Sequence, residues 1–217
     1  SALAAGKNPE SSLAYVQAVL LGTAGLLPSQ KGAAPHYWAP SEKAWCEYGV
    51  SRGVTTPWQA FRVRPENAPV RRVMAAGHLA ARYAHQGLLA NLQDTATGEP
   101  AWIPGRIVQA LLVQDANGRA LLGQTRALEA VVNVVLPLLH ARASERGDVF
   151  FASRILDAYR ACPPLADNHI TQDMKRMLLP GGHAKLPASA LCQQGLTHLY
   201  QKRCVGLHCQ GCALGDD

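Results

Sequence analysis

The chain has 217 residues, 48% of them hydrophobic and 17% charged, so it is long enough to bury a full core and is not disordered over its bulk. Its longest apolar stretch, 127–141, is interrupted by polar residues and proline, and it is shorter than the ~20 residues of a membrane span. We therefore expect no membrane-spanning helix. Residues 1–9 lack the features of a secretory signal, so a cytoplasmic protein is expected.

The chain carries a net charge of +6 and has an isoelectric point of about 9.1. Lysine and arginine neutralise phosphates and release counterions, so this charge favours a polyanionic partner such as nucleic acid. The alternative is that the charge is only that of an ordinary basic bacterial protein. A net charge of +6 supports these two interpretations about equally.

Two helices are predicted in the first fifty residues. Ser11 and Ser12 are typical N-cap residues for an apolar helix that Gly25 ends. A second, shorter helix is predicted over 40–48, where glutamate, tryptophan and tyrosine recur at helical spacing before a glycine. The segment 29–39 between them is predicted to be a loop.

The clearest helical pattern begins at Pro69, with Asn67 as the expected cap. Its apolar positions recur at three and four residues, and they are Val70, Val73, Met74, Gly77, Ala81, Ala84 and Leu88. The segment 94–105 is rich in turn-forming residues and is predicted to be a loop. The segment 107–122 is ambiguous, because the pair Asn117-Gly118 favours a tight hairpin turn and thus a small β-ribbon.

Helices are predicted for most of the remaining chain. One opens at Thr125 and kinks or stops near Pro137. Its inward positions are Leu128, Val131, Val132, Val135 and Leu138. Asp148 is predicted to cap the next helix, which ends before the prolines at 163 and 164. The apolar stripe predicted to face inward on that helix consists of Phe151, Ile155, Leu156 and Tyr159.

Two further helices are predicted, over 168–179 and 189–200. No repeat of fixed period and no long linker divides the chain. We therefore predict an all-α fold, with one small hairpin near 107–122 as its only β-structure. The predicted organisation is a single helical domain over 1–200 and a cysteine-rich tail over 201–217 packed on it.

Three of the six cysteines crowd near the C-terminus, at Cys204, Cys209 and Cys212. A CxxC pair turns two thiolates towards one ion, and a third thiolate nearby leaves one tetrahedral position to fill. Zinc or an iron–sulfur cluster fits this donor set, and the alternative is a metal-free tail with free thiols. The other three cysteines occupy apolar helical positions and are expected in the core, and they are Cys46, Cys162 and Cys192.

The candidates for the fourth metal ligand are Cys192, His198 and His208. Along an unbroken helix Cys192 would lie about 18 Å from Cys204, so these two could share an ion only if the chain reverses between them. His208 adjoins Cys209, and neighbouring side chains seldom converge on one ion. His198, near the end of a predicted helix, is therefore ranked first.

A second constellation lies around a turn that leads into a predicted helix. Its arginines, Arg62, Arg64, Arg71 and Arg72, are candidates for binding an anion such as a phosphate. The alternative, which we consider the better one, is that Arg64 and Arg71 fold inward and hold the loop through carbonyls or through Glu66 and Glu129. The two readings differ in whether a ligand is required.

No catalytic motif is found in the chain. His169 follows Asp167 and Asn168, and a carboxylate beside a histidine can orient or charge it. Asp-Asn before a helix is also an ordinary cap, which is the better interpretation. Nucleophile-elbow, zinc-protease and phosphate-loop motifs are absent from the sequence, so an enzymatic activity is uncertain.

Several short segments, in their order, resemble the C-terminal half of a bacterial family called domain of unknown function 2851. They are 18–28, 61–72, Asn133 to Pro137, Asn168 to Thr171, and Gln194 through Cys212. Longer members carry an N-terminal region similar to a restriction-endonuclease-type nuclease fold. The resemblance implies a helical companion of a nuclease-like domain, and it favours nucleic acid as the partner. The cysteine spacing is also similar to part of the four-cysteine loop of helical DNA glycosylases, without the fourth cysteine.

The sequence thus predicts a helical module, without catalytic activity of its own, that binds or positions nucleic acid and carries a C-terminal metal knuckle. The alternative is a structural or protein-interaction module in which a metal only staples the tail. Salt dependence separates the two, because phosphate contacts weaken steeply with salt.

Overall fold

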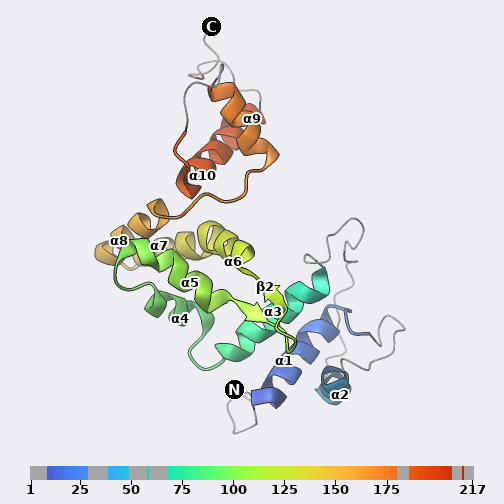
Figure 1. Ribbon diagram of the computed structural model, residues 1–217. Helices are drawn as coiled ribbons and strands as arrows, with labels where there is room; N and C mark the ends of the chain where they lie inside the picture. Colours follow the sequence, from blue (N-terminus) through green and yellow to red (C-terminus); the bar gives the residue numbers. More distant parts are fainter. Residues whose placement is uncertain are drawn as a thin grey trace. The chain divides into compact units, whose positions relative to one another are not determined.

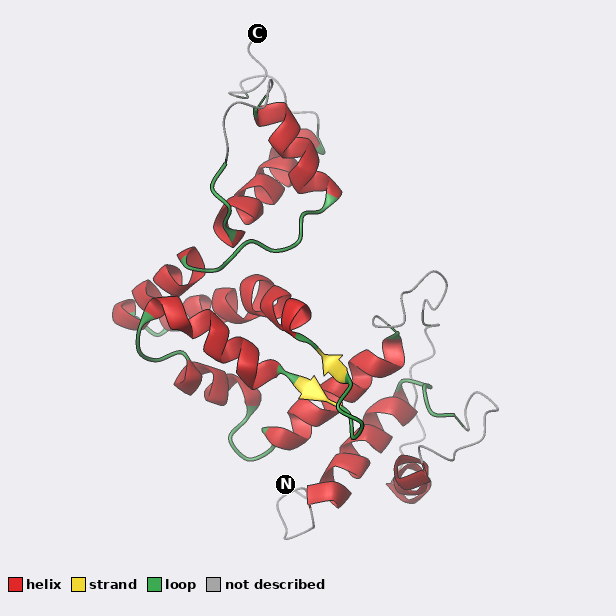
Figure 2. Ribbon diagram, in the orientation of Figure 1, coloured by secondary structure: helices red, strands yellow, loops and turns green. Residues whose placement is uncertain are grey.

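The structure is a computed structural model that describes residues 9–28, 39–48, 58, 68–179, 186–206 and 212. These residues are mostly helical, and the sheet among them is a two-stranded antiparallel hairpin, so the predicted fold class is confirmed (Figure 1, Figure 2). The chain forms two compact units. Unit 1 comprises 1–94 and 109–124, and unit 2 comprises 95–108 and 125–217. The single domain over 1–200 stays a prediction.

The two helices predicted near the N-terminus are confirmed as α1 (Pro9–Thr23) and α2 (Ala39–Tyr48). Helix α1 begins before Ser11 and Ser12, so these serines lie inside the helix and the N-cap predicted for them is wrong. The loop predicted over 29–39 falls outside the described residues except for its last residue, which begins α2.

Gly25 ends α1 as predicted. Its φ is +65°, a left-handed value that is strain-free only without a Cβ. Leu26 N donates to Leu21 O at 2.9 Å, and Gly25 N donates to Gly22 O at 3.1 Å. These two bonds form the Schellman pattern of helix ends, and Leu21 and Leu26 both belong to the core of unit 1.

Helix α1 packs against both α2 and α3 (Pro69–Arg82) through glycines. A Cβ on Gly22 would lie 2.3 Å from ring carbons of Trp45 in α2. A Cβ on Gly77 of α3 would lie 3.0 Å from Cγ of Gln17 in α1. The absence of a side chain at these two positions therefore permits the close approach of three helices. The buried core around them consists of Leu21, Ala24, Leu26, Leu27, Met74, Ala75, Val113 and Leu121.

Helix α3 confirms the pattern that begins at Pro69, although it is shorter than predicted. Its N-cap position is Ala68, without a side-chain cap, and the predicted cap Asn67 lies outside the described residues. The helix ends at Arg82, and Leu88 instead begins the next helix, α4 (Leu88–Thr95). The helical spacing continues across a break at Gly87, whose φ is +79°.

The loop predicted over 94–105 is wrong over most of its length. A 3-10 turn, η4 (Pro100–Trp102), leads directly into α5 (Ile103–Leu111). Pro100 and Pro104 stand in the first turns of these two elements, where a missing N–H costs nothing. The prolines thus mark helix starts, and only 96–99 lies outside regular structure.

The hairpin is confirmed, but α5 occupies the first part of the region where it was predicted. Strands β1 (Val113–Gln114) and β2 (Ala120–Leu122) pair antiparallel with a register shift. Asp115 N donates to Arg119 O at 2.9 Å, and Gly118, with φ +74°, donates to Asp115 O at 3.0 Å. The loop therefore has three residues with glycine in the left-handed position, rather than the tight two-residue turn.

In unit 2, α6 (Gln124–Ala130), a π-helical turn η5 (Val131–Val135) and α7 (Leu136–Glu145) follow one another without a break. The helix therefore does not stop at Pro137, which lies in the first turn of α7. Leu138 is exposed, so its predicted inward position is wrong. The wider π turn adds a residue and shifts the buried face to Leu136 and Leu139.

Helix α8 (Val149–Arg160) packs against α7 and begins as predicted. Asp148 caps it by accepting a hydrogen bond from Phe151 N at 3.0 Å. Ile155 is buried, but Leu156 is exposed, so the prediction of an inward Leu156 is wrong. The buried stripe runs instead through the small residues Ala152 and Ala158, which leave room for close helix packing.

The last two predicted helices are confirmed as α9 (His169–Leu178) and α10 (Ala190–Leu199). Ser189 caps α10 through Cys192 N. A second π-helical turn, η6 (Tyr200–Cys204), continues α10 directly. The boundary at residue 200 predicted between domain and tail therefore lies inside a helical stretch.

Of the three cysteines predicted to lie in the core, only one is fully buried. Cys162 is buried, and burial raises the pKa of its thiol to about 11. Cys192 is half-buried, and Cys46 is exposed, so the prediction for Cys46 is wrong. Cys46 follows Trp45, which packs against the core of unit 1, and one residue turns an α-helix by about 100°, so Cys46 points away from that contact.

The helical stretch 124–145 has 22 residues and is long and apolar enough, by length and composition, to cross a membrane. Core helices of soluble proteins meet the same criterion. Five of its side chains are fully buried in the fold, and they are Ala127, Val131, Val132, Leu136 and Leu139. The expectation that no helix spans a membrane stays a prediction.

Candidate functional site

Two of the four arginines predicted to bind an anion, Arg71 and Arg72, lie in the first turn of α3, whereas Arg62 and Arg64 fall outside the described residues. Arg71 reaches across to the hairpin, where its Nη2 donates to Ala120 O at 2.5 Å. This contact is of the kind that the inward-folding interpretation expects. Glu129, named as an alternative partner, instead pairs with Arg126.

The far end of α3 also holds the hairpin region through a basic side chain. Arg82 Nη1 donates to both Ala110 O and Leu112 O at 3.0 Å. Tyr83 donates its hydroxyl to Ala110 O at 2.8 Å, and the Arg82 guanidinium lies 5.9 Å from its ring centroid. Sequence reasoning missed Arg82, although Arg71, His78 and Arg82 recur at helical spacing and so share one face of α3.

The charges on this face of α3 are bonded to neutral groups. Arg71 and Arg82 donate to backbone carbonyls, so these contacts leave their positive charge uncompensated. Between them, burial and the nearby Arg82 lower the pKa of His78, and Asp115 in the hairpin turn acts in the opposite direction. Arg71 and Arg82 thus donate to backbone carbonyls on either side of His78, which Asp115 also influences.

The metal-ligand candidates are only partly described. Cys204 ends the π turn after α10, Cys212 is half-buried, and Cys209 lies outside the described residues. Both described thiols are free. His198 lies in the same continuous helical stretch as Cys204, and a rise of 1.5 Å per residue separates the two by about 9 Å along the axis. Within the described residues, no three histidine, cysteine or acidic side chains gather closely enough to hold a metal.

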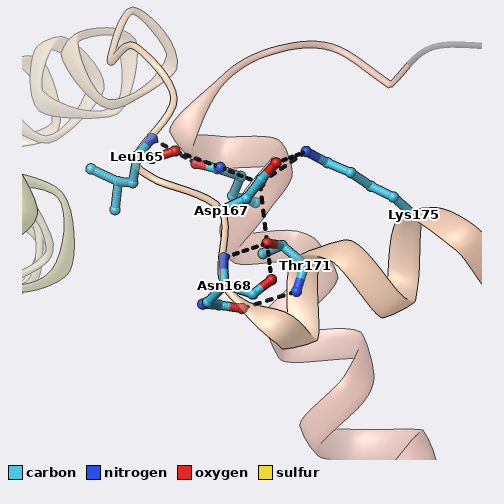
Figure 3. A network of polar contacts seen from close by, with 6 residues as sticks. Leu165, Asp167, Asn168, Thr171 and Lys175 are labelled. Atoms are coloured by element: carbon cyan, nitrogen blue, oxygen red, sulfur yellow. Dashed lines mark hydrogen bonds and ion pairs between the residues drawn. The ribbon is translucent and has the colours of Figure 1, made fainter.

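The start of α9 forms a polar network that Figure 3 shows from close by. Asn168 caps α9, since its side chain accepts from Thr171 N at 2.9 Å while Thr171 Oγ1 accepts from Asn168 N at 3.0 Å. This reciprocal capping box confirms the interpretation of Asp167-Asn168 as a cap. His169 is the first residue of the helix, and no catalytic pairing is needed to explain its position.

Asp167 lies at the centre of this network. Its carboxylate accepts from Lys175 Nζ at 2.8 and 2.9 Å and from Thr171 Oγ1 at 3.1 Å (Figure 3). It also accepts from Gln193 Nε2 of α10 at 2.9 Å. The hydrogen bonds from Lys175 and then Gln193 lower the pKa of Asp167. These hydrogen bonds connect the 165–168 segment with α9 and α10. We call this structural contact the clasp.

Gln193 and Gln194, which are consecutive on α10, each hold a distant segment. The Gln193 amide also donates to Leu165 O at 2.8 Å and accepts from Leu165 N at 2.7 Å. Gln194 Nε2 donates to Asn133 Oδ1, in the π turn of unit 2, at 2.8 Å. Sequence reasoning singled out neither glutamine as a contact residue, and a lone amide in a helix gives no signal of its partner.

Comparisons with known proteins give no match: no family model, no curated protein and no solved structure corresponds to this chain. The resemblance to domain of unknown function 2851 therefore stays a prediction.

Proposed function

We propose that this chain is a helical module, without catalytic activity of its own, that binds nucleic acid in the cytoplasm through α3 and the hairpin of unit 1. The observation that carries the proposal is the bonding of Arg71 and Arg82 to neutral carbonyls. These bonds hold the guanidinium groups of half-buried Arg71 and exposed Arg82 without cancelling their charge. Arginines of unit 2 are of both kinds: Arg160 and Arg176 pair with carboxylates, whereas Arg106 donates to Thr97 O at 2.9 Å.

The distribution of charge over the chain supports unit 1 as the unit that binds. Unit 1 contains ten lysines and arginines against six aspartates and glutamates, a net +4 of the total +6. A phosphate backbone is attracted to such a field irrespective of base sequence. A nuclease-like domain, which the family resemblance implies as a companion, would then act on nucleic acid that this module holds.

The test is a salt titration of binding to labelled duplex DNA and to single-stranded RNA. Each neutralised phosphate of duplex DNA contributes about −0.9 to the slope of log affinity against log salt. We expect the double variant Arg71→Gln, Arg72→Gln to make the slope of log affinity against log salt shallower by up to about 1.8. Glutamine is chosen at position 71 because its amide keeps a donor for Ala120 O. A parent protein that binds neither probe at low salt would overturn the proposal.

A second candidate, a protein-interaction module, is favoured by exposed apolar side chains in unit 2. Val149 and Phe150, in the first turn of α8, are 76% and 88% exposed, and Trp102 of η4 is 70% exposed. The turn η4 packs against α8, and large exposed apolar side chains are typical of interfaces when they form one patch. A partner bound here should be lost with Phe150→Ser, and its affinity should change little between about 50 and 200 mM salt.

We further propose that Cys204, Cys209 and Cys212 bind zinc, with His198 as the first candidate for the fourth ligand. Three thiolates match the preference of zinc for soft ligands in closed sites. Elemental analysis of aerobically and anaerobically purified protein tests this: stoichiometric zinc supports it, iron would point to an iron–sulfur cluster, and neither would leave free thiols. Cys204→Ser should lower the metal content, whereas Cys46→Ser, an exposed cysteine outside the tail, should not.

A further inference from the structure

The hairpin turn holds the backbone of Arg119 in a fixed place. Arg119 N donates to Asp115 Oδ1 at 2.9 Å, and Arg119 O accepts from Asp115 N at 2.9 Å. A second bond to the same carboxylate oxygen comes from Asn117 N at 2.9 Å. The side chain of Arg119 itself is exposed, and the structure gives its guanidinium no hydrogen bond or ion pair within the described residues.

The fold places the backbone of this arginine beside a carbonyl that α3 contacts. Arg119 immediately precedes Ala120, whose carbonyl accepts the hydrogen bond from Arg71 across 49 positions of sequence. Arg71, Arg72 and Arg119 therefore project from two segments that this bond ties together. The hairpin thus adds an exposed arginine next to the point where α3 contacts it.

The nearby acidic group does not neutralise Arg119 through a direct ion pair. Asp115 Oδ1 accepts from two backbone N–H groups and so belongs to the turn. Guanidinium groups on adjoining segments repel one another, and an anion that contacts both relieves this repulsion. A chain of phosphates, with its regularly spaced charges, can contact two such points at once.

We propose that Arg119 is a further phosphate-contacting residue, and that a nucleic-acid backbone passes from the first turn of α3 to the hairpin turn. The inference rests on the proposed function of unit 1. It predicts that the hairpin supplies affinity without base specificity, because a single exposed arginine on a turn offers contacts to phosphates rather than a rigid bidentate reading of a base edge.

The test compares Arg119→Gln with Arg146→Gln, which removes the same charge from an exposed residue of unit 2 whose side chain has no partner among the described residues. Binding of labelled duplex DNA and single-stranded RNA is measured by fluorescence anisotropy over a range of salt. We expect Arg119→Gln to weaken duplex binding severalfold at low salt and to reduce the steepness of the salt dependence by about 0.9. Arg119→Lys should restore most of the slope, since it keeps the charge.

The outcomes separate the two proposals. If the parent protein binds but Arg119→Gln behaves like Arg146→Gln, the role of Arg119 is overturned and the proposed function of unit 1 stands. If the parent protein binds neither probe, the proposed function itself is overturned. Far-UV circular dichroism of each variant checks the fold, and a loss of structure in Arg119→Gln that Arg119→Lys does not repair would also overturn the inference, since the side chain would then be structural.

Discussion

Replacing Asp167 with alanine removes the centre of the clasp between the 165–168 segment, α9 and α10. The variant loses the ion pair with Lys175 and the acceptor for Thr171 and Gln193. Gln193 keeps its bond to Leu165 O, and Thr171 keeps its bond to Asn168 O at 3.0 Å. Thr171 and Gln193 therefore lose only part of their bonding, whereas Lys175 Nζ loses both of its bonds to Asp167.

The size of the effect follows from the exposure of the pair. The side chains of Asp167 and Lys175 are 37% and 38% exposed, so solvent screens the ion pair and it contributes about 0.5 kcal/mol. Two side-chain hydrogen bonds add about 0.5 kcal/mol each at the lower end of their range. The total is about 1.5 kcal/mol, which corresponds to roughly a tenfold rise in the population of the locally open state.

Hydrogen exchange read by mass spectrometry measures this opening in peptides that cover α9 and α10. Asp157→Ala is the matched control, because it removes an exposed pair with Arg160 within a single helix, and it should change stability by less than about 0.5 kcal/mol. Equal exchange in α9 and α10 for the two variants would refute the role assigned to the clasp.

The pH dependence provides a second check on the same variant. Hydrogen bonds from Lys175 and Gln193 lower the pKa of Asp167 in the folded state. The carboxylate therefore contributes its full stabilisation above the unfolded pKa of about 3.9, and this contribution is lost as the pH falls through the folded pKa. The difference between parent and variant should shrink on acidification, and an undiminished difference would show that charge is not its source.

The remaining predictions concern packing and thiol chemistry. Gly22→Ala should destabilise the protein by about 1–3 kcal/mol in denaturant titrations, because its Cβ would overlap Trp45. Gly105→Ala, in a helix and with nothing within 4 Å of the added Cβ, should instead stabilise by about 0.5–1 kcal/mol, and equal effects would refute the packing argument. Iodoacetamide at mildly alkaline pH should label exposed Cys46 quickly and Cys162 slowly, because burial raises the Cys162 pKa to about 11; peptide mapping that finds both labelled alike would contradict this.

Helix ends were predictable where the signal is local. Asp148, Asn168 and Ser189 each bond a backbone N–H three residues ahead, so the sequence next to the helix contains the whole interaction. The prolines at 100 and 104 led instead to the wrong prediction of a loop, because a proline can either break a helix or begin one. Composition alone does not distinguish these two uses.

Contacts between distant segments were not predictable from the sequence. The sequence predicts that Arg71 contacts an anion or folds inward onto carbonyls or onto glutamates, but the carbonyl that it contacts belongs to Ala120, on a different element. Leu138 was placed inward because a regular 3.6-residue period was assumed, whereas the π turn changes the phase before it. Of the candidate site, the residue types were available from the sequence, and their partners depended on the fold.

The two compact units are interleaved along the chain, and this affects how the protein can be divided. The chain leaves unit 1 after residue 94, returns to it at 109 and leaves again after 124. Helix α5 supplies residues to both units, because the boundary at 108 and 109 lies within it. Any fragment that begins or ends between 95 and 124 therefore removes part of each unit. Expression of either half alone should yield an incomplete core, and a circular permutation or an insertion would have to respect three crossings instead of one.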